Sequence, residues 1–215
     1  MDDLVSYYAR RAAEYERIYA KPERQADLAA LRARFGKLLA GKHVLELACG
    51  TGYWTEVIAS RAAQVTAVDA NEEVLQIART KRYPENRVDF ISGDCYSPPD
   101  SGRRHDALFA GHWWSHVPLG RMDAFLQTAV QSVAPGAMIA FFDNNYVAGS
   151  STVVSRRDTE GNSYQTRRLE DGSTHEVLKN FPAESELMQR ASRFGWGANV
   201  ELFQYYWLLT FRAPK

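Results

Sequence analysis

The sequence predicts an α/β fold built on a mostly parallel sheet, with a late antiparallel strand and an inserted β-hairpin. Short apolar segments of strand length alternate with segments of helical periodicity between residues 43 and 142. A glycine-rich turn directly follows the first apolar segment. An Asp171-Gly172 pair near the C-terminal end marks a hairpin. Strands that alternate with helices favour parallel pairing through right-handed crossovers.

The elements are expected in a simple order along the chain. Two helices, at 3–20 and 23–35, come first, because Lys21-Pro22 interrupts the helical pattern between them. Five strands are expected at 43–47, 64–68, 87–91, 105–110 and 137–142, with helices at 53–60, 71–80 and 119–133. A hairpin at 164–179, a helix at 183–193 and an aromatic strand at 202–211 close the chain.

The length of 215 residues fits a single domain with a small insertion. Its expected parts are an N-terminal helical cap (1–36), a ligand-binding core (42–143), a lid insertion (144–182), and a C-terminal helix and strand (183–215).

Composition excludes several classes of protein. The 26 basic and 26 acidic residues balance, so the chain has no surplus charge for sequence-blind binding to nucleic acid. Two cysteines cannot form a disulfide framework, and the N-terminal residues do not read as a signal peptide. No apolar run reaches the ~20 residues of a membrane span, and no residue spacing indicates a metal site. We therefore expect a cytoplasmic protein with a small-molecule ligand and no membrane partner, and the sequence leaves a homodimer open.

The turn after the first strand carries the main functional signal. Glu46 ends the strand, and Gly50 and Gly52 follow in a turn where free N–H groups of a helix start can meet a ligand. Asp69 ends the second strand, where an acidic residue of a doubly wound fold accepts hydrogen bonds from ribose hydroxyls. Glu46 would repel a pyrophosphate but suits an ammonium or sulfonium ligand, which disfavours a nucleotide-dependent dehydrogenase. The alternative is a tight strand-to-helix turn without a ligand.

This pattern resembles the class I S-adenosylmethionine (SAM) methyltransferases, whose fold is Rossmann-like. The resemblance implies SAM as cofactor and a set of cofactor-binding positions. These are the methionine site at Glu46, Ala48, Gly50 and Gly52, the ribose site at Asp69 and Ala70, and the adenine site at Gly93, Asp94 and Cys95. Asp94 has a plainer alternative as a helix cap or turn residue.

The loop after the fourth strand lies where ligands meet a parallel sheet. His112 and His116 are the candidate catalytic residues, because an imidazole can accept a proton, and Trp113 is a candidate substrate wall. The alternatives are that His112 only caps the strand and that His116 only caps the next helix.

The predicted hairpin supplies a cationic cluster. A two-residue Asp171-Gly172 turn pairs Arg168 with His175 and places both on one face with Lys179, while Arg167 faces the other side. Such a face favours an anion-binding lid. The alternative is a hairpin whose charges only keep it solvated.

The chain also resembles the phosphonate O-methyltransferases of the dehydrophos pathway. The segments that carry this resemblance are residues 6–15, 46–55 and 112–118, together with the basic hairpin. The resemblance implies that Tyr7, Tyr8, Arg11 and Tyr15 cover the cofactor and that Lys179 contacts an anion. Tyr19 is a further candidate substrate-binding residue.

The sequence thus predicts a SAM-dependent methyltransferase that methylates a small molecule, at an oxygen of an acidic (phosphonate- or carboxylate-like) or phenolic group. The alternatives are a tRNA, rRNA or protein methyltransferase and a SAM-binding protein without catalysis.

Overall fold

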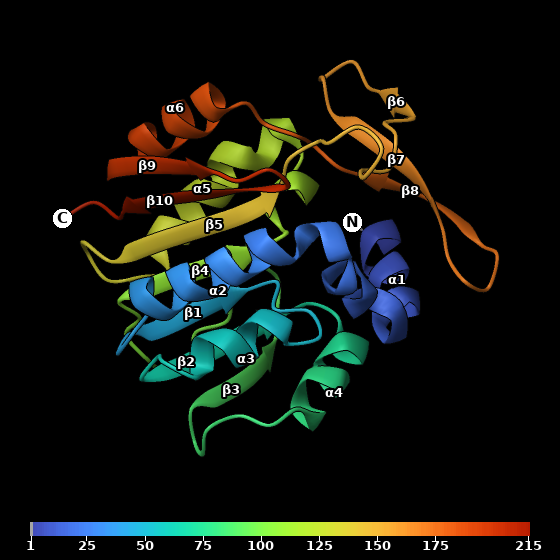
Figure 1. The fold of residues 1–215 in the computed structure, drawn as a ribbon. Helices are drawn as coiled ribbons and strands as arrows, with labels where there is room; N and C mark the ends of the chain where they lie inside the picture. Colours follow the sequence, from blue (N-terminus) through green and yellow to red (C-terminus); the bar gives the residue numbers. More distant parts are fainter. Residues whose placement is uncertain (1) are drawn as a thin grey trace.

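The computed structural model describes residues 2–215 and contains a seven-stranded sheet with helices on both faces (Figure 1). The strand order is β3-β2-β1-β4-β5-β10-β9, in which β1 to β5 are parallel and β10 runs antiparallel to both of its neighbours. The strands are β1 (His43–Leu47), β2 (Gln64–Asp69), β3 (Val88–Ser92), β4 (Ala107–Gly111), β5 (Met138–Asn144), β9 (Trp196–Leu202) and β10 (Tyr206–Arg212). The chain reverses direction across the sheet between β1 and β4, which is the position where ligands bind to open α/β sheets.

Six α-helices and four 3₁₀ helices connect the strands in the part of the chain that the structure describes. The α-helices are α1 (Asp2–Arg11), α2 (Gln25–Leu38), α3 (Tyr53–Ala59), α4 (Glu72–Thr80), α5 (Met122–Gln131) and α6 (Glu184–Phe194). The 3₁₀ helices are η1 (Ala12–Ala20), η2 (Pro22–Arg24), η3 (Trp114–His116) and η4 (Leu119–Arg121).

The central strands of the sheet are buried on both faces, whereas the edge strands β3 and β9 are half-buried or exposed. Val44 packs with α2 and α3 on one side, whereas its neighbour Leu45 packs with α5 and α6 on the other. Successive side chains of a strand point to opposite faces, so a strand covered on both sides needs apolar residues throughout. This is why the five parallel strands were readable as short continuous apolar runs. The predicted fold class is confirmed.

The N-terminal segment differs from the single helix expected at 3–20. An α-helix ends at Arg11, and a nine-residue 3₁₀ helix follows. Side chains three residues apart eclipse one another in a 3₁₀ helix. Tyr15, Ile18 and Lys21 therefore lie in one row, and all three line the same cavity.

The closing strand expected at 202–211 corresponds to β10, and a further strand, β9, precedes it at Trp196–Leu202, where the sequence predicted none. β9 and β10 pair in antiparallel orientation, and the short connection at Phe203 to Tyr205 joins them. A hydrogen bond from Phe203 N to Tyr206 O closes this connection. Aromatic residues fill the connection, so the usual turn residues that would have marked it are missing.

A second sheet of three strands forms the insertion, with order β6-β7-β8. Its strands are β6 (Arg156–Arg157), β7 (Ser163–Arg168) and β8 (Thr174–Leu178). Figure 1 shows this sheet beside α1, away from the main sheet. Tyr7 of α1 joins Leu169 and Val177 in a small apolar cluster that ties the two elements together.

The hairpin register expected from a two-residue turn is wrong by one residue. Arg167, not Arg168, pairs with His175. Leu169 accepts a hydrogen bond from Gly172 N and donates to Ser173 O, which closes a three-residue loop. Gly172 takes the left-handed conformation with φ 85°, as the third residue of such a loop requires. A shift of one residue exchanges the two faces of a strand.

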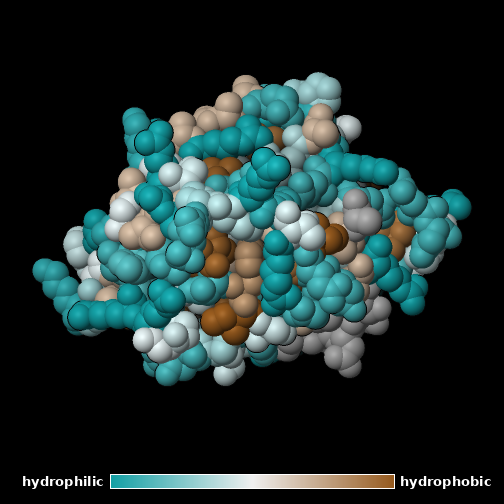
Figure 2. Space-filling view, turned by 90° about the horizontal axis from the view of Figure 1, so that it is seen from below, coloured by the Kyte–Doolittle hydropathy of each residue, from teal (hydrophilic) through white to brown (hydrophobic). Residues whose placement is uncertain are grey.

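Figure 2 shows one face of the molecule, which is mostly hydrophilic with small separate hydrophobic patches near its centre. Exposed large apolar residues are few among those described; they are Tyr146, Val153, Trp196 and Leu202. No helix in the described part of the chain has the length and apolar character needed to cross a bilayer.

Candidate active site

The glycine-rich turn opens space beside the end of β1. Ala48 and Gly50 both have positive φ angles, 53° and 55°. A Cβ atom built on Gly50 would meet nothing within 4 Å, so this residue faces open space. Gly52, with φ 80°, has a different role, because a Cβ there would lie 2.4 Å from the hydroxyl of Tyr83. Gly52 therefore permits the close packing of α3 against α4 rather than lining the cavity.

A cavity of about 290 Å³ lies over this turn at the carboxyl ends of the parallel strands. Its lining contains the predicted cofactor residues Tyr15, Ala48, Gly50, Asp69, Ala70, Asp94 and Cys95. Thr51, Asn71, Val74 and Gly111 also line it and were not predicted. Trp113 was predicted to meet the substrate, but it lies in the wall of this first cavity.

Asp69 is held in place by backbone N–H groups. Its Oδ2 accepts a hydrogen bond from Gly50 N at 2.8 Å, and its Oδ1 accepts one from Asn71 N at 2.9 Å. Burial raises the pKa of Asp69, and these N–H groups oppose that shift. A carboxylate oxygen accepts more than one hydrogen bond, so both oxygens keep capacity for the hydroxyls of a ribose.

Glu46 lies beneath the turn and is 1% exposed. It lines a small cavity of about 20 Å³ together with Tyr19 and Tyr53. Burial raises the pKa of Glu46 to about 8, and its Oε2 has no hydrogen-bond partner in the described structure. A buried carboxyl with one oxygen that lacks a partner, under the open turn, fits the ammonium or sulfonium group of a bound ligand.

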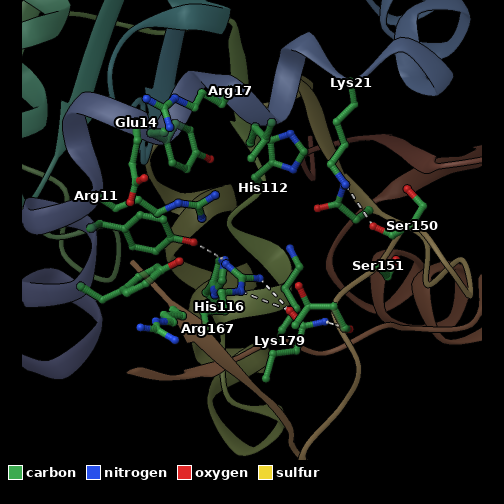
Figure 3. Close-up of a pocket in the computed structure, with 18 of the residues that line it drawn as sticks. Arg11, Glu14, Arg17, Lys21, His112, His116, Ser150, Ser151, Arg167 and Lys179 are labelled. Atoms are coloured by element: carbon green, nitrogen blue, oxygen red, sulfur yellow. Dashed lines mark hydrogen bonds between the residues drawn. The ribbon is translucent and has the colours of Figure 1, made fainter. Parts of the chain in front are cut away.

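A second cavity of about 420 Å³ adjoins the first (Figure 3). Basic residues dominate its charged lining, which comprises Arg11, Arg17, Lys21, Arg24, Arg167, Arg168 and Lys179 against the single carboxylate of Glu14. The side chains come from the N-terminal helices and from the inserted sheet, so residues far apart in the sequence form one basic chamber.

Four residues, Tyr8, Tyr15, His112 and His116, line both cavities. His112 follows β4 in a left-handed conformation with φ 57°, which is uncommon for a residue other than glycine. Neither of its ring nitrogens makes a hydrogen bond within the described structure, although Nδ1 lies 3.5 Å from Asp143 Oδ1. Burial lowers the pKa of His112, so the ring is neutral at pH 7.

His116 is fixed in one tautomer by its two hydrogen bonds. Nδ1 lies 2.7 Å from the carbonyl oxygen of Leu178, which can only accept, so Nδ1 carries the proton. Nε2 lies 2.8 Å from the hydroxyl of Tyr8 and accepts from it. Burial, with the nearby charges of Lys179 and Arg167, holds the pKa of His116 well below its usual value. The ring therefore offers a neutral nitrogen acceptor at the wall that both cavities share.

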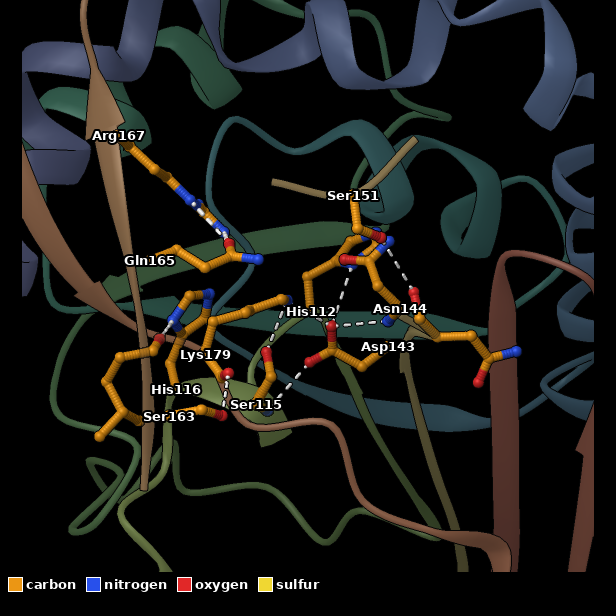
Figure 4. Close-up of polar contacts among 12 residues, drawn as sticks. His112, Ser115, His116, Asp143, Asn144, Ser151, Ser163, Gln165, Arg167 and Lys179 are labelled. Atoms are coloured by element: carbon orange, nitrogen blue, oxygen red, sulfur yellow. Dashed lines mark hydrogen bonds and ion pairs between the residues drawn. The ribbon is translucent and has the colours of Figure 1, made fainter. Parts of the chain in front are cut away.

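A buried ion pair stands behind these histidines (Figure 4). Lys179 Nζ donates to Asp143 Oδ1 at 2.7 Å and to Ser115 Oγ at 2.6 Å. Ser115 N donates to Asp143 Oδ2 at 3.0 Å. The network joins β5, the loop that carries both histidines, and the end of β8.

Three residues of the predicted anion lid lie in different surroundings. Arg167 shares the inward face of the hairpin with His175, whereas Arg168 is exposed on the rim of the basic cavity. His175 does not line this cavity; it bonds Ser173 Oγ at 3.0 Å and packs on Tyr7. Lys179 lines the cavity, but Asp143 already balances its charge.

The remaining predicted residues surround the two cavities. Tyr7 and Arg11 line the basic cavity, and the Arg11 guanidinium lies 5.7 Å from the centre of the Tyr7 ring. Tyr19 is buried below, stacked on Tyr53 with ring centroids 3.7 Å apart, and it lines the small Glu46 cavity. Gly93 lines none of these cavities; a Cβ there would meet Pro99 at 2.5 Å.

Comparisons with known proteins identify the family. Residues 44–136 match a family model described as a methyltransferase domain. DhpI of the dehydrophos pathway, solved as an SAH complex, is 31% identical; the alignment covers 99% of this chain and 96% of DhpI with a TM-score of 0.79. The chain belongs to the class I SAM-dependent methyltransferases. The SAM–HEP complex of DhpI gives 30% identity, coverage of 97% and 95%, and a TM-score of 0.80.

More distant relatives agree with this assignment. The methyltransferase is 30% identical to the ubiquinone biosynthesis O-methyltransferase of Azoarcus sp. (strain BH72) over 76% of this chain and 66% of the relative. The enzyme of the same name from Coxiella burnetii (strain RSA 331 / Henzerling II) is 28% identical over 73% and 64%. The chain thus spans about two thirds or less of these relatives' length. PH0226 from Pyrococcus horikoshii OT3, 19% identical with coverage of 94% and 99%, shares the fold with a TM-score of 0.72.

The resemblance to the dehydrophos enzyme and the assignment as a methyltransferase are confirmed by these matches, and SAM is the cofactor that this family uses. Sequence reasoning also missed two residues at or beside the basic cavity. Arg167 was placed on the wrong face by the register shift, and Asp143 gave no local signal because its partner is 36 residues away.

Proposed function

We propose that this methyltransferase transfers the methyl group of SAM to an oxygen of a small acidic molecule held in the basic cavity. The observation that carries the proposal is a set of cations without carboxylate partners next to the cofactor cavity. Arg11, Lys21, Arg24 and Arg167 line the basic cavity, and none forms an ion pair in the described part of the chain.

These cations gain from an anion that enters the cavity. Arg167 donates to Gln165 Oε1 at 2.8 Å, a neutral acceptor, and Arg11 lies against the rings of Tyr7 and Tyr15. Charge-assisted hydrogen bonds are about twice as strong as neutral ones, so a carboxylate or phosphonate would replace weaker contacts by stronger ones. The cavity of about 420 Å³ has the dimensions of a small-molecule site.

The first cavity and the small cavity that Glu46 lines supply the groups that would hold SAM. Asp69 would accept from the ribose, Glu46 would face the cationic methionine part, and Asp94 and Cys95 stand at the predicted adenine end. When bound, SAM supplies a methyl group on a sulfonium, which is electrophilic. The residues that separate the two cavities would then determine how the acceptor oxygen is aligned with that methyl group.

Alignment accounts for most of the catalysis in this scheme. The oxygen of an acidic group is already deprotonated at pH 7, so the transfer needs orientation and exclusion of water rather than a base. His112 and His116 stand on the wall between the cavities as neutral rings, and Tyr8 and Tyr15 complete this wall. These residues would hold the acceptor in line with the methyl group.

Substitution of Arg167 tests the proposal. Methyl transfer from labelled SAM is measured for a panel of carboxylic and phosphonic acids with wild-type enzyme, Arg167→Met, and the matched control Arg157→Met. Arg157 belongs to the same small sheet but is exposed and does not line the cavity.

We expect Arg167→Met to raise the KM for an acidic substrate at least ~10-fold, in line with a charged hydrogen bond of about 1.5–3 kcal/mol. Calorimetric binding of S-adenosylhomocysteine should stay unchanged in both variants. An unchanged KM in Arg167→Met would contradict the proposal.

One observation favours a second candidate, the methylation of a phenolic hydroxyl. His116 Nε2 already accepts a hydrogen bond from a phenolic hydroxyl, that of Tyr8. If a substrate phenol took the place of the Tyr8 hydroxyl, His116 Nε2 could accept its proton. A panel of phenols in the same assay separates the candidates, because phenol methylation should be lost in His116→Gln, whereas methylation of an acid should largely persist.

A further inference from the structure

The basic side chains of the cavity include two separate groups, one at each end of the cavity. Arg11 and Arg167 lie at one end, beside the wall formed by Tyr8. Figure 3 shows Lys21 with Ser150 on the opposite side of His112 from Arg11 and Arg167. A small acid with one anionic group can engage one of these ends, so the other set of cations requires a separate explanation.

Arg24 is the most informative residue of the far end. It is only 7% exposed, and its Nε has no hydrogen-bond partner in the described structure. Its Nη2 donates to Ser150 Oγ at 3.1 Å, and its guanidinium lies over the rings of Tyr205 and Tyr206 at 5.3 and 5.6 Å from their centres. A buried cation with an unused donor is costly unless an acceptor reaches it. Arg24 lines the cavity, so an acceptor inside the cavity can supply that contact.

Lys21 adds a second cation at this end. Its Nζ donates to the carbonyl oxygen of Ser150 at 3.1 Å and keeps two further N–H donors. Glu23 is the carboxylate nearest along the chain and accepts from Ser150 Oγ at 3.0 Å. It is exposed and does not line the cavity, so it does not occupy the position in front of Lys21 and Arg24.

Two other cations of the lining already have carboxylate partners. Lys179 pairs with Asp143 at 2.7 Å, and Arg17 pairs with Glu170. The lining also contains the carboxylate of Glu14 and the exposed Arg168. The buried or half-buried cations that form no ion pair in the described structure therefore lie at the two ends, with the neutral ring of His112 between them.

We propose that the substrate carries two separate anionic groups, one at each end of the basic cavity. The group at Arg11 and Arg167, beside the wall shared with the cofactor cavity, supplies the acceptor oxygen. The second group is an anchor that binds Lys21 and the unused Nε of Arg24. The substrate class is then a small diacid, either dicarboxylic, phosphonocarboxylic or bisphosphonic. This inference rests on the proposed function, since it assumes an acidic acceptor.

The test compares the binding of one-headed and two-headed acids. Ethylphosphonate and the α,ω-alkane bisphosphonates with two to six carbons are titrated by calorimetry into enzyme saturated with S-adenosylhomocysteine. A bisphosphonate of the matching length should bind at least ~10-fold more tightly than ethylphosphonate, which exceeds the twofold statistical gain from two equal heads and corresponds to about 1.4 kcal/mol.

Variants identify the anchor. Lys21 is partly exposed, so the Lys21→Met variant should fold. It should bind the bisphosphonate no more tightly than ethylphosphonate, and its affinity for ethylphosphonate should equal that of wild type. Lys37→Met is the matched control, because Lys37 is an exposed lysine near the far end of α2 and should leave both affinities unchanged. Ser150→Ala provides a second variant of the anchor without a change of charge, and it should weaken the bisphosphonate alone.

The outcomes separate this inference from the proposed function. If ethylphosphonate binds but no bisphosphonate gains more than twofold, the two-anion inference is overturned and the acidic acceptor stands. The same holds if Lys21→Met weakens both compounds equally. If neither class of acid binds, the proposed function and this inference fall together.

Discussion

The buried ion pair between Asp143 and Lys179 leads to the most direct stability prediction. Asp143 is fully buried and accepts from three donors, Ser115 N at 3.0 Å, Asn144 N at 2.8 Å and Lys179 Nζ at 2.7 Å. The variant Asp143→Asn keeps the shape of the side chain but has one oxygen and one NH₂ group. Its NH₂ group must face either the ammonium or a backbone N–H, so one donor is always left without an acceptor.

The magnitude follows from the burial of the pair. Removing one partner of a buried ion pair costs about 3–5 kcal/mol, because the other charge is left uncompensated. For a domain of this size each kcal/mol lowers the melting temperature by about 2–4 °C, so Asp143→Asn should melt roughly 6–20 °C below wild type. The double variant Asp143→Asn with Lys179→Met removes both charges and should recover most of that loss.

The stabilisation that the Asp143 carboxylate provides should decrease as the pH falls. Burial alone would raise the pKa of Asp143, but the Lys179 ammonium and the His112 ring hold it well below its usual value. The unfolded chain takes up this proton at a higher pH, near 3.9, than the folded chain does. The stabilisation is therefore complete above about pH 4 to 5 and declines as the pH falls toward the folded pKa. The difference in stability between wild type and Asp143→Asn should narrow in the same range.

Thermal unfolding followed by circular dichroism measures the melting temperatures of Asp143→Asn, Lys179→Met and the double variant. The reasoning is refuted if Asp143→Asn melts within 2 °C of wild type at pH 7, since about 0.5–1 kcal/mol would then be all that the pair contributes. It is also refuted if the double variant loses the sum of the two single losses, because the charges would then act independently.

Four further predictions follow from individual residues. Asp69→Ala should weaken SAM binding at least ~10-fold in calorimetry, the loss expected for a charged hydrogen bond, while the melting temperature shows that the fold is kept. Gly52→Ala should lower the melting temperature more than Gly136→Ala, because both glycines have positive φ but only at position 52 does a Cβ meet other atoms. Glu46→Gln should melt above wild type at pH 9 and equal to it below about pH 4.5, because a pKa raised to about 8 makes the ionised carboxyl a cost that appears only as the pH rises. At saturating SAM, the kcat/KM of wild type for a carboxylic acid should stay flat between pH 6 and 9, since the pKa of His116 lies well below 6.5; a limb near that value would show that the ring titrates as it does in water.

The cofactor side of the site was largely predictable from the sequence. Gly50 follows β1 and Asp69 ends β2, two mostly apolar parallel strands whose carboxyl ends lie at one edge of the sheet. The positions of these residues depend on local turns and on neighbouring strands, both of which leave patterns in the sequence. Gly52 and Gly93 belong to the same two predicted motifs, and at both positions a Cβ would meet a neighbouring side chain, Tyr83 or Pro99; their contact with the cofactor stays a prediction.

The substrate side was less predictable because it depends on register and on long-range pairing. The dipeptide Asp171-Gly172 fits a two-residue turn and a three-residue loop equally well, yet only the latter directs Arg167 inward. Arg24 falls at the start of the helix expected at 23–35 and gave no signal of its own; it is buried beneath the distant rings of Tyr205 and Tyr206.

Tyr8 and Tyr15 belong to the N-terminal helices and contribute to the walls of both cavities. A ligand in either cavity therefore restrains the same two side chains, and the second ligand meets a wall that is already ordered. Such a shared wall makes the two affinities interdependent, and thermodynamic linkage requires the dependence to be equal in both directions. An acceptor that tightens the enzyme's hold on SAM must be held more tightly by the same factor once SAM is present. The same reciprocity applies to spent cofactor, because any effect that it has on the affinity for the acceptor is matched by an equal effect of the acceptor on its own affinity.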